Sequence, residues 1–483
     1  MAISSKLFRT SFAVILLSVS CLASAVLRWD WNTIDTNQIN FPKEFLFGVA
    51  TSAGQVEGNC TNHQHVEHEG VHERMPEVCG DACDHYNRYK QDVQLIKNLN
   101  ANAYRFSVEW SKIEPQEGVF DEDVLQHYVD VCDELLANGI KPVVTLHHYT
   151  EPIWFADCAD GLGGFTKMEN IKYFVRFAQK MFETLGNRVD KWITFSSPVG
   201  HVMPSFAVGI KPPYKKDLAL ALETLKNVLE AHVQVYQAIK KMEGGEQTQI
   251  GITHTIHQLD VLSKKDFVGR FYAYMGDLFT TKPIYNFLTK GVFKARVPFK
   301  ANVRHVNKLA PKSLDFIALS YYSHCGLKGW GNRGRYPGEK KVWKDGCTIY
   351  AEGMCRALKE LNKKVASKLN IPIIVTENGV APYVDQEDDR DLFLRRYIYA
   401  ISKSIEDGID VQGYIYWSLM DNYEWGKYYD YIEVYDLENG KGQLEKIRIN
   451  DGYGLYAVDF ETQERTLKQS AQYFIDVAGR FAV

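Results

Sequence analysis

The stretch Lys141-Pro-Val-Val-Thr-Leu146 has the composition of a strand that is buried on both faces. It is a short, nearly continuous run of apolar and β-branched residues without apolar–polar alternation. Amphipathic segments with helical periodicity, residues 124–136 and 170–185, lie before and after it. A run of this kind between helices is typical of a parallel sheet whose two faces are covered.

Seven more runs share these properties, at residues 45–50, 102–108, 191–195, 249–253, 314–319, 371–376 and 411–417. Further amphipathic segments separate several of them, at residues 86–99, 218–239, 356–368 and 392–405. Eight such strands in a chain of 483 residues predict an α/β fold, a single (β/α)8 TIM barrel over residues 41–483. A doubly wound open sheet is the alternative, but no Gly-x-Gly-x-x-Gly motif follows the first run.

The N-terminus has the layout of a signal peptide. Lys6 and Arg9 precede an apolar run over residues 11–22, and Ala23-Ser-Ala25 follows as a cleavage pattern. We therefore predict a signal peptide over residues 1–25, an N-terminal extension over residues 26–40, and a protein that is secreted, or periplasmic in a bacterium. An uncleaved anchor is the alternative. No second apolar run of spanning length follows, so we expect no membrane partner after cleavage.

Export would place the eight cysteines after residue 25 in an oxidising compartment. Cys60 with Cys79 or Cys83 is a candidate loop staple, although sequence does not determine the connectivity. Asn59-Cys60-Thr61 matches the acceptor pattern for N-glycosylation, which matters only in a eukaryotic host.

The charge and histidine content exclude other classes of partner. The net charge of −4 comes without a basic stripe, so we expect no nucleic acid partner. Residues 63–72 contain four histidines, but their spacing fits no standard metal site, and we predict neither a metal nor a cofactor. Aromatic residues make up 13% of the chain, which suits either an aromatic core and surface or the stacking of sugars. The sequence does not indicate an oligomeric state.

Polar and aromatic residues are concentrated where the predicted strands end. In a (β/α)8 barrel the loops at this end of the strands carry the chemistry. Carboxylates and amides bind hydroxyl groups, and indole rings stack on the apolar face of a sugar. The residue types therefore predict a carbohydrate site, formed by Gln55, Glu57, Arg105, His147, His148, Ser196, Ser197, Tyr321, Tyr322, Glu377, Asn378, Trp417, Glu424 and Trp425.

A series of motifs at these positions is similar to those of glycoside hydrolase family 1, the β-glucosidase-like retaining enzymes. Each motif is weak alone, but all of them occur in order between about residues 41 and 478. They are Phe-Pro-Lys-Glu-Phe-Leu-Phe-Gly (41–48), Ser-Ala-Gly-Gln-Val-Glu-Gly (52–58), Tyr-Arg-Phe-Ser-Val-Glu-Trp (104–110) and Val-Thr-Leu-His-His (144–148). The later ones are Asp-Phe-Ile-Ala-Leu-Ser-Tyr-Tyr (315–322), Val-Thr-Glu-Asn-Gly (375–379), Tyr-Trp-Ser-Leu-Met-Asp-Asn-Tyr-Glu-Trp (416–425) and Gly-Leu-Tyr-Ala-Val-Asp-Phe (454–460).

The resemblance implies a role for each matching residue. Glu377 matches the nucleophile, and Arg105 and Tyr322 match the groups that keep this carboxylate ionised. The implied substrate is a β-linked glycoside or oligosaccharide. The residues that match sugar-binding positions are Gln55, His148, Glu424 and Trp425 for the hydroxyl groups and Trp417 for the stacking platform.

The chain departs from the family pattern at the end of the fourth predicted strand. Family members usually have Thr-Phe-Asn-Glu-Pro there, whereas this chain has Thr194-Phe-Ser-Ser-Pro198. Ser197 thus stands where the family has its general acid/base, and Ser196 where it has an Asn that contacts the sugar. Ser320 also replaces an Asn. A serine hydroxyl does not supply a proton near neutral pH, and losing a general acid/base typically slows catalysis about 10²–10⁴-fold.

Two interpretations follow from this departure. In the first, the protein is an enzyme for glycosides with good leaving groups, as in plant thioglucosidases, or uses water or another acid such as Glu151 or His201. In the second, it is a pseudoenzyme that binds a glycoside without turning it over. Transglycosylation is a further use of the same nucleophile. Residues 428–450, rich in charge and Tyr, are either part of the site's mouth or, as we expect, a surface insertion.

Overall fold

The structure is a computed structural model of the 483-residue chain. It describes residues 27–60, 62–63, 65, 80–156, 162–297, 300–329, 332–336, 339–340, 348–382, 387–422, 424–425, 431–436, 441–446 and 452–482. The predicted signal peptide and most of the histidine-rich loop lie outside these residues.

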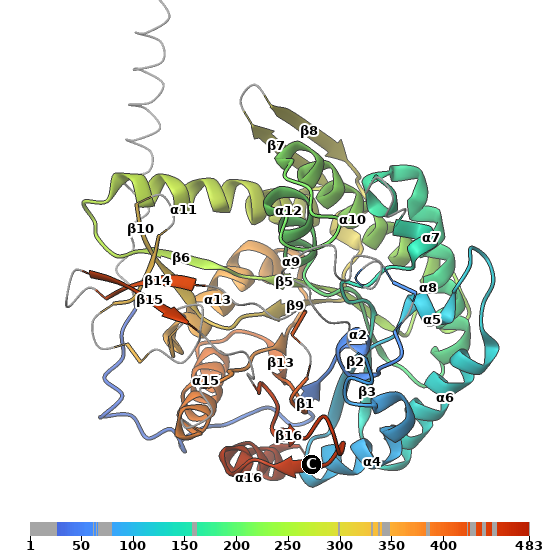
Figure 1. Cartoon of the computed structure of the whole chain (residues 1–483), viewed down its shortest axis with the longest axis horizontal. Helices are drawn as coiled ribbons and strands as arrows, with labels where there is room; N and C mark the ends of the chain where they lie inside the picture. The colour runs from blue at the N-terminus through green and yellow to red at the C-terminus, as the bar shows by residue number, and fades with distance from the viewer. Residues whose placement is uncertain are drawn as a thin grey trace, which may run out of the picture.

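Eight parallel strands form a closed barrel (Figure 1), which confirms the predicted fold. Around the barrel the order is β1-β2-β3-β4-β5-β9-β12-β13, and β13 pairs with β1. Their bounds are Leu46–Ala50, Ala103–Ser107, Lys141–His147, Lys191–Phe195, Gln249–Thr255, Phe316–Ser320, Ile373–Glu377 and Val411–Trp417. Every predicted run coincides with one of these strands to within about two residues at each end, because each run is an uninterrupted β-prone segment.

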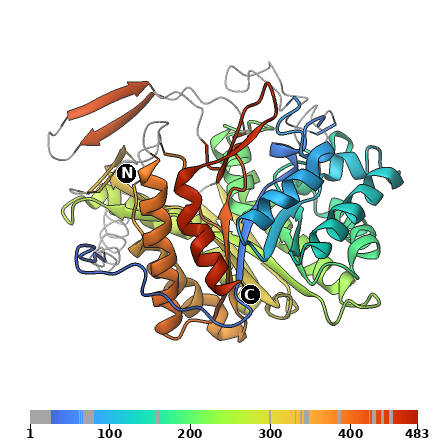
Figure 2. The same cartoon turned by 90° about the horizontal axis from the view of Figure 1, so that it is seen from below.

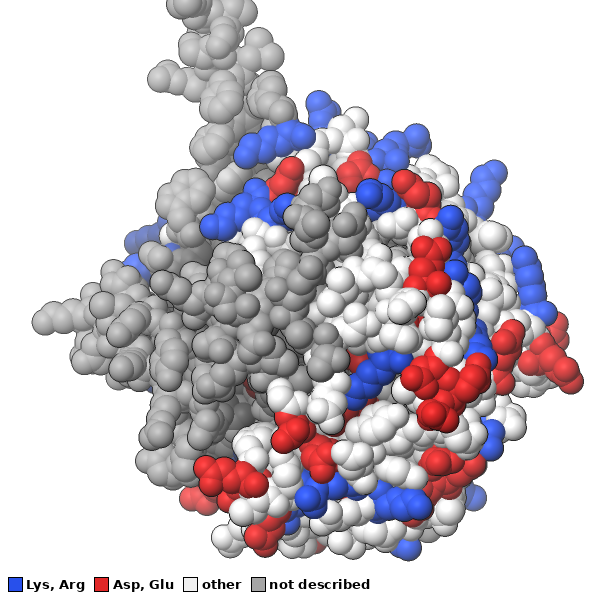
Figure 3. Space-filling model, turned by 45° about the vertical axis from the view of Figure 1, so that its right-hand side comes forward, with Lys and Arg blue, Asp and Glu red and all other residues white. Residues whose placement is uncertain are grey.

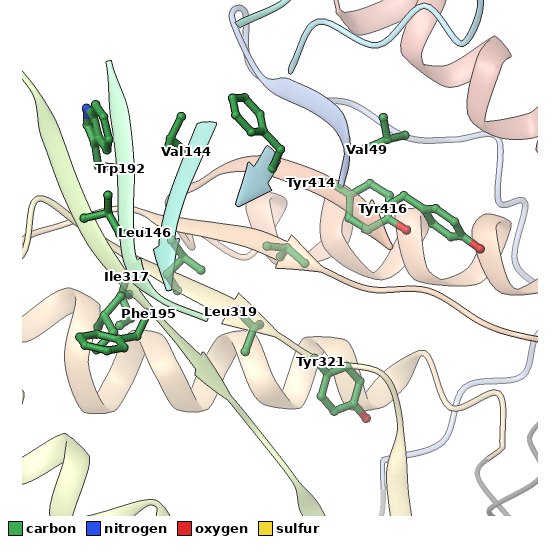
Figure 4. Close-up of a cluster of buried hydrophobic side chains, with 14 of the residues drawn as sticks. Val49, Val144, Leu146, Trp192, Phe195, Ile317, Leu319, Tyr321, Tyr414 and Tyr416 are labelled. Carbon is green, nitrogen blue, oxygen red and sulfur yellow. The ribbon is translucent and has the colours of Figure 1, made fainter. Parts of the chain in front are cut away.

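Both faces of the strands are buried, as the lack of alternation predicted. One set of side chains fills the barrel interior, among them Val143, Ile193, Ile374 and Ile415. The neighbouring residues along the same strands point outward to the helices, as Val144 and Trp192 do (Figure 4). Side chains alternate faces along a strand, so a strand covered on both sides has apolar residues at successive positions rather than at every second one.

Helices surround the barrel; most of them join successive strands, and the last one follows the final barrel strand. They include α4 (His85–Asn98), α6 (Glu122–Ala137), α8 (Ile171–Leu185), α10 (Leu218–Ile239), α13 (Glu352–Leu361), α15 (Asp388–Glu406) and α16 (Gln472–Phe481). Asp121 caps the start of α6 by accepting hydrogen bonds from the amides of Asp123 and Val124. Gly139, with φ +74°, ends the same helix and turns the chain into β3. α15 and α16 lie side by side along the barrel (Figure 2).

A second sheet lies beside the barrel and was not predicted. Its order is β15-β14-β11-β10-β6, with β6 at Gln258–Val261, β10 at His324–Lys328 and β11 at Asn332–Gly334. The hairpin of β14 (Tyr431–Asp436) and β15 (Lys441–Lys446) joins it through a pairing of Gly334 with Tyr435. The described parts of the segment 428–450 thus extend a sheet, and its interpretation as a surface insertion stays a prediction. A separate hairpin, β7 (Val292–Val297) with β8 (Ala301–Val306), also went unpredicted.

The described part of the N-terminal extension lies against the helices. The backbone amide of Trp29 and the indole of Trp31 both donate to Glu352 Oε1 on α13, at 2.9 and 3.1 Å. Trp29 and Trp31 also meet Tyr399 of α15 edge to face. Residues 27–40 are thus held in place by buried polar and aromatic contacts.

The other expectations concern features that the described residues cover only in part. Cys79 lies outside them, so the predicted loop staple stays a prediction. Within the described part of the chain, no helix combines the length and hydropathy needed to cross a bilayer. The face shown in Figure 3 carries acidic and basic side chains interspersed with each other.

Candidate active site

Residues from four different strands meet at the end of the barrel where the strands finish. Arg105 lies on β2, Ser196 directly follows β4, Ser320 ends β9, and Glu377 ends β12. Each residue is far from the others in sequence, but parallel strands bring their carboxyl ends to the same rim. All four are nearly or completely buried.

The Glu377 carboxylate is paired with a buried arginine. Nη1 of Arg105 donates to Oε1 of Glu377 at 2.6 Å and to the carbonyl oxygen of Thr376 at 3.1 Å. Nε of Arg105 donates to the hydroxyl of Thr145 at 3.0 Å, which orients the guanidinium. Burial alone would raise the pKa of Glu377, but Arg105 and the hydrogen bonds to the carboxylate hold it below its usual range.

Three hydroxyl groups complete the surroundings of this carboxylate. Ser196 donates to Oε1 at 3.0 Å, while Ser320 and Tyr322 donate to Oε2 at 3.0 and 3.2 Å. Burial and the nearby Glu377 charge raise the pKa of Tyr322 well above its usual value, so the phenol stays a donor. Ser196 and Ser320, which were read from the sequence as departures from a family pattern, therefore both bind Glu377 directly.

The residues predicted to bind sugar also gather here. Gln55 is fully buried, accepts from Ser52 at 2.6 Å and donates to Asn422 at 2.9 Å. The His148 ring lies 5.6 Å from that of Trp417 and 6.3 Å from that of Trp425, and its Nε2 is 3.8 Å from Glu377 Oε1.

The protonation states at this rim follow from burial. Burial lowers the pKa of His148 to about 3, against the attraction of the Glu377 carboxylate, so the imidazole is neutral near pH 7. Glu424 is half-buried and acts electrostatically on Tyr322 and on Lys211. Two of the residues that the sequence proposed for the site have other partners: Glu57 accepts hydrogen bonds from Lys112 and Tyr128, and Tyr321 donates to Gln258.

Ser197 is packed into this rim and its hydroxyl is fully engaged. It is 2% exposed and begins the short helix α9 (Pro198–Val202). Its Oγ accepts from the Thr255 hydroxyl at 2.6 Å and from the Gly200 amide at 3.1 Å, and it hydrogen bonds with Tyr149. Its φ of +47° lies in the left-handed region. The Ser197 hydroxyl is therefore occupied by hydrogen bonds within the protein.

Glu151 cannot serve as the substitute acid that its position suggested. His147 and His201 place their Nε2 atoms 3.3 and 3.1 Å from Glu151 Oε1. Burial alone would raise the pKa of Glu151, but the two imidazoles lower it to about 2. The group is therefore a carboxylate at neutral pH, and the Nε2 of His201, the other candidate, faces this carboxylate.

His147, Glu151 and His201 also have the spacing of metal ligands. Among the described residues, they form the single group of three or more His, Cys, Asp or Glu side chains with this property. Their donor atoms all lie within 4.8 Å of one another, and all three residues are buried. A carboxylate that accepts hydrogen bonds from two imidazoles accounts for the same geometry without an ion. Most of the histidine-rich loop lies outside the described residues. Of its four histidines, His63 and His65 are described.

Lys211 also lies at this site, and the sequence reasoning missed it. Its Nζ stands 4.4 Å from the ring centre of Tyr149 and 5.3 Å from that of Trp425. The residue follows the π-helical turn Met203–Val208 in the loop after β4, outside every recognised motif. No sequence signal distinguishes it from Lys215 and Lys216, which are nearby in the same loop.

The comparisons with known proteins agree with this architecture. The model of the family described as glycosyl hydrolase family 1 matches residues 37–481. Beta-glucosidase 22 of Arabidopsis thaliana is 30% identical, and the aligned region covers 93% of this chain and 92% of the relative. The 6-phospho-beta-galactosidase of Clostridium acetobutylicum is 29% identical, and the aligned region covers 90% of this chain and 96% of the relative. The solved beta-glycosidase from Pyrococcus horikoshii is 30% identical, with TM-score 0.75 and 92% and 98% coverage. The chain belongs to glycosyl hydrolase family 1.

Proposed function

We propose that this family 1 protein is a secreted, retaining β-glycosidase that uses Glu377 as its nucleophile and acts on glycosides with good leaving groups. The observation that carries the proposal is the buried Glu377 carboxylate with four donors around it, from Arg105, Ser196, Ser320 and Tyr322. Secretion rests on the signal-peptide layout of residues 1–25.

The surroundings of Glu377 suit attack on an anomeric carbon. A nucleophilic carboxylate must be ionised when the substrate arrives, and Arg105 favours that form. In a retaining mechanism the carboxylate displaces the leaving group and forms a covalent glycosyl-enzyme, which water then hydrolyses. Gln55, His148 and Glu424 supply groups that bind sugar hydroxyls, and Trp417 supplies a face for stacking.

Ser197 restricts which leaving groups depart at a useful rate. The retaining mechanism pairs the nucleophile with a second carboxyl group that protonates the leaving oxygen. Without that acid, catalysis slows by about 10²–10⁴-fold for a poor leaving group, or about 3–5 kcal/mol of barrier. A leaving group that is stable as an anion needs no proton and escapes this cost.

The names of the relatives support a β-glucoside as the starting substrate class. Several curated relatives are named β-glucosidases, and one is a 6-phospho-β-galactosidase. A solved β-glucosidase from Thermotoga maritima, 25% identical, is in complex with deoxynojirimycin. We therefore choose an aryl β-glucoside as the test substrate.

The test is a burst experiment with 2,4-dinitrophenyl β-glucoside. We expect a burst of phenol that is stoichiometric with protein, a matching gain of one glycosyl group in the intact mass, and faster turnover with azide. Glu377→Gln keeps the size of the side chain and removes the nucleophile, so it should abolish both burst and adduct. Absence of burst and adduct in the unsubstituted protein would overturn the proposal.

A second function, glycoside binding without turnover, is favoured by one observation. The Ser197 hydroxyl is fully satisfied by Thr255, Gly200 and Tyr149, as expected of a residue that stabilises structure. If the burst is absent but adding the glucoside causes a saturable change in tryptophan fluorescence, the protein is a binder.

A further inference from the structure

Lys211 is an ammonium group held at the site by aromatic rings. Its Nζ lies over the faces of Tyr149 and Trp425, at 4.4 and 5.3 Å from their ring centres. The carboxylates of Glu424 and Glu377 act on it electrostatically. Among the described residues, no carboxylate oxygen lies within 4.0 Å of Nζ, so its protons are not bound in a close ion pair.

The position of this ammonium relates it to Ser197. Tyr149 hydrogen bonds with Ser197 through its hydroxyl, and the same ring carries Lys211 on its face. One aromatic ring therefore separates the ammonium from the place where the resemblance expects a carboxylic acid. Four flexible methylenes let a lysine swing from a ring face toward a bound leaving group.

Several groups near Ser197 do not offer a proton at neutral pH. Ser197 is engaged, Glu151 is ionised between its two imidazoles, and His148 is neutral. Burial and the Glu377 charge raise the pKa of Tyr149. Lys211 stands over Tyr149, the ring that binds Ser197, and its ammonium has protons that it can transfer, whereas a guanidinium is not deprotonated in proteins.

We propose that Lys211 is the proton donor and acceptor that replaces the missing carboxylic acid in this site. The inference rests on the proposed function, because it needs Glu377 to form a glycosyl-enzyme. The inference assigns a catalytic role to a residue that lies outside the motifs shared with the family.

The two steps balance in atoms and charge. In the first, Glu377 bonds to the anomeric carbon, the bond to the leaving oxygen breaks, and an ammonium proton of Lys211 moves to that oxygen. In the second, water bonds to the anomeric carbon, the ester bond to Glu377 breaks, and a water proton returns to the Lys211 amine. The resting state is restored, with the glycoside hydrolysed to sugar and alcohol.

The protonation equilibrium of Lys211 suits both steps. Burial lowers the pKa of Lys211 to about 8, against the opposing attraction of Glu424 and Glu377. The group is then mostly charged at pH 7 and is still acidic enough to give up its proton. An unperturbed lysine would hold its proton too tightly for this role.

The test compares two leaving groups in matched variants. Lys211→Met should lower kcat/KM for phenyl β-glucoside by about 10²-fold, and leave the burst rate with 2,4-dinitrophenyl β-glucoside within about 3-fold. Lys211→Arg keeps the charge but not a transferable proton, so it should resemble Lys211→Met. Lys216→Met, an exposed lysine of the same loop, is the control and should change neither.

A pH profile supplies the second readout. With phenyl β-glucoside, kcat/KM should fall above about pH 8 in the unsubstituted protein, as Lys211 loses its proton. This alkaline limb should be missing in Lys211→Met, whose thermal unfolding checks that it is folded. Full activity of Lys211→Arg, an equal loss with both leaving groups, or an unchanged pH profile would overturn the assignment of Lys211.

The experiments distinguish a failure of the role proposed for Lys211 from a failure of the proposed function. A burst with the dinitrophenyl substrate, together with no effect of Lys211→Met on phenyl β-glucoside, removes only the role of Lys211. Absence of the burst in the unsubstituted protein removes the nucleophilic mechanism, and the role of Lys211 with it.

Discussion

Replacing Ser197 by Glu tests whether a carboxylic acid at this position can supply the proton that the leaving group needs. In a protein that also carries Lys211→Met, we expect Ser197→Glu to raise kcat/KM for phenyl β-glucoside by about 10²-fold, at the lower end of the range for a general acid/base. This corresponds to about 2.7 kcal/mol of barrier. The left-handed φ of +47° already accommodates a side chain with a Cβ, so the backbone adds no new cost.

The lower end of the range follows from crowding at this position. Ser197 is 2% exposed, and the hydroxyl groups of Thr255 and Tyr149 occupy the space that a longer side chain would enter. Overpacking typically costs about 1–3 kcal/mol, and losing the hydroxyl that accepts from Gly200 adds about 1 kcal/mol. We therefore expect a lower free energy of unfolding together with the gain in rate. Adding Tyr149→Phe should recover part of that stability.

The assay needs a control that separates the proton from the added bulk. Ser197→Gln has nearly the same shape as Ser197→Glu and cannot act as an acid near neutral pH. The ratio of kcat/KM between the two variants with phenyl β-glucoside therefore isolates proton transfer, and denaturant unfolding reports the packing cost of each. Equal rates for the Glu and Gln variants, with both folded, would refute the reasoning.

Three other perturbations test the packing and electrostatics of the barrel. Arg105→Met leaves the buried Glu377 without its cation, so we expect a loss of about 3–5 kcal/mol of stability in denaturant unfolding, and no burst. Ile193→Ala opens a cavity in the barrel interior and should cost about 2–5 kcal/mol by the same measurement. Glu151 has a folded pKa of about 2, below its ordinary value of 4.5, so its contribution to stability is complete above pH 4.5 and is lost as pH falls toward 2. Glu151→Gln should flatten that part of the curve of unfolding free energy against pH; an unchanged curve would show that the pairing with the two histidines has no such effect.

Much of the barrel could be predicted because its strands are local patterns. A run such as residues 141–146 has apolar or β-branched residues at successive positions after Lys141, and that property follows from burial on both faces whatever the partner strand is. The second sheet could not be found in the same way. β11 has three residues, β10 is His-Cys-Gly-Leu-Lys without an apolar run, and β14 and β15 contain charged residues, so their pairing depends on contacts between distant segments.

The candidate site was likewise predictable only in part. The motifs located Glu377, Arg105, Tyr322 and the aromatic residues, because each motif lies at the end of a predicted strand. The hydrogen-bond partners of these residues could not be predicted from the motifs. Ser196 and Ser320 were read as lost amides, whereas in the structure both donate to Glu377.

What the sequence by itself determined is the barrel, the position of Glu377 at the end of a strand and the absence of a carboxylic acid at residue 197, since these depend on residue type and order. The tertiary structure alone decided that Glu151 is ionised between two imidazoles and that Lys211 stands over Tyr149. A side chain's protonation and reach depend on burial and on neighbours from other strands and loops, which the order of residues does not specify.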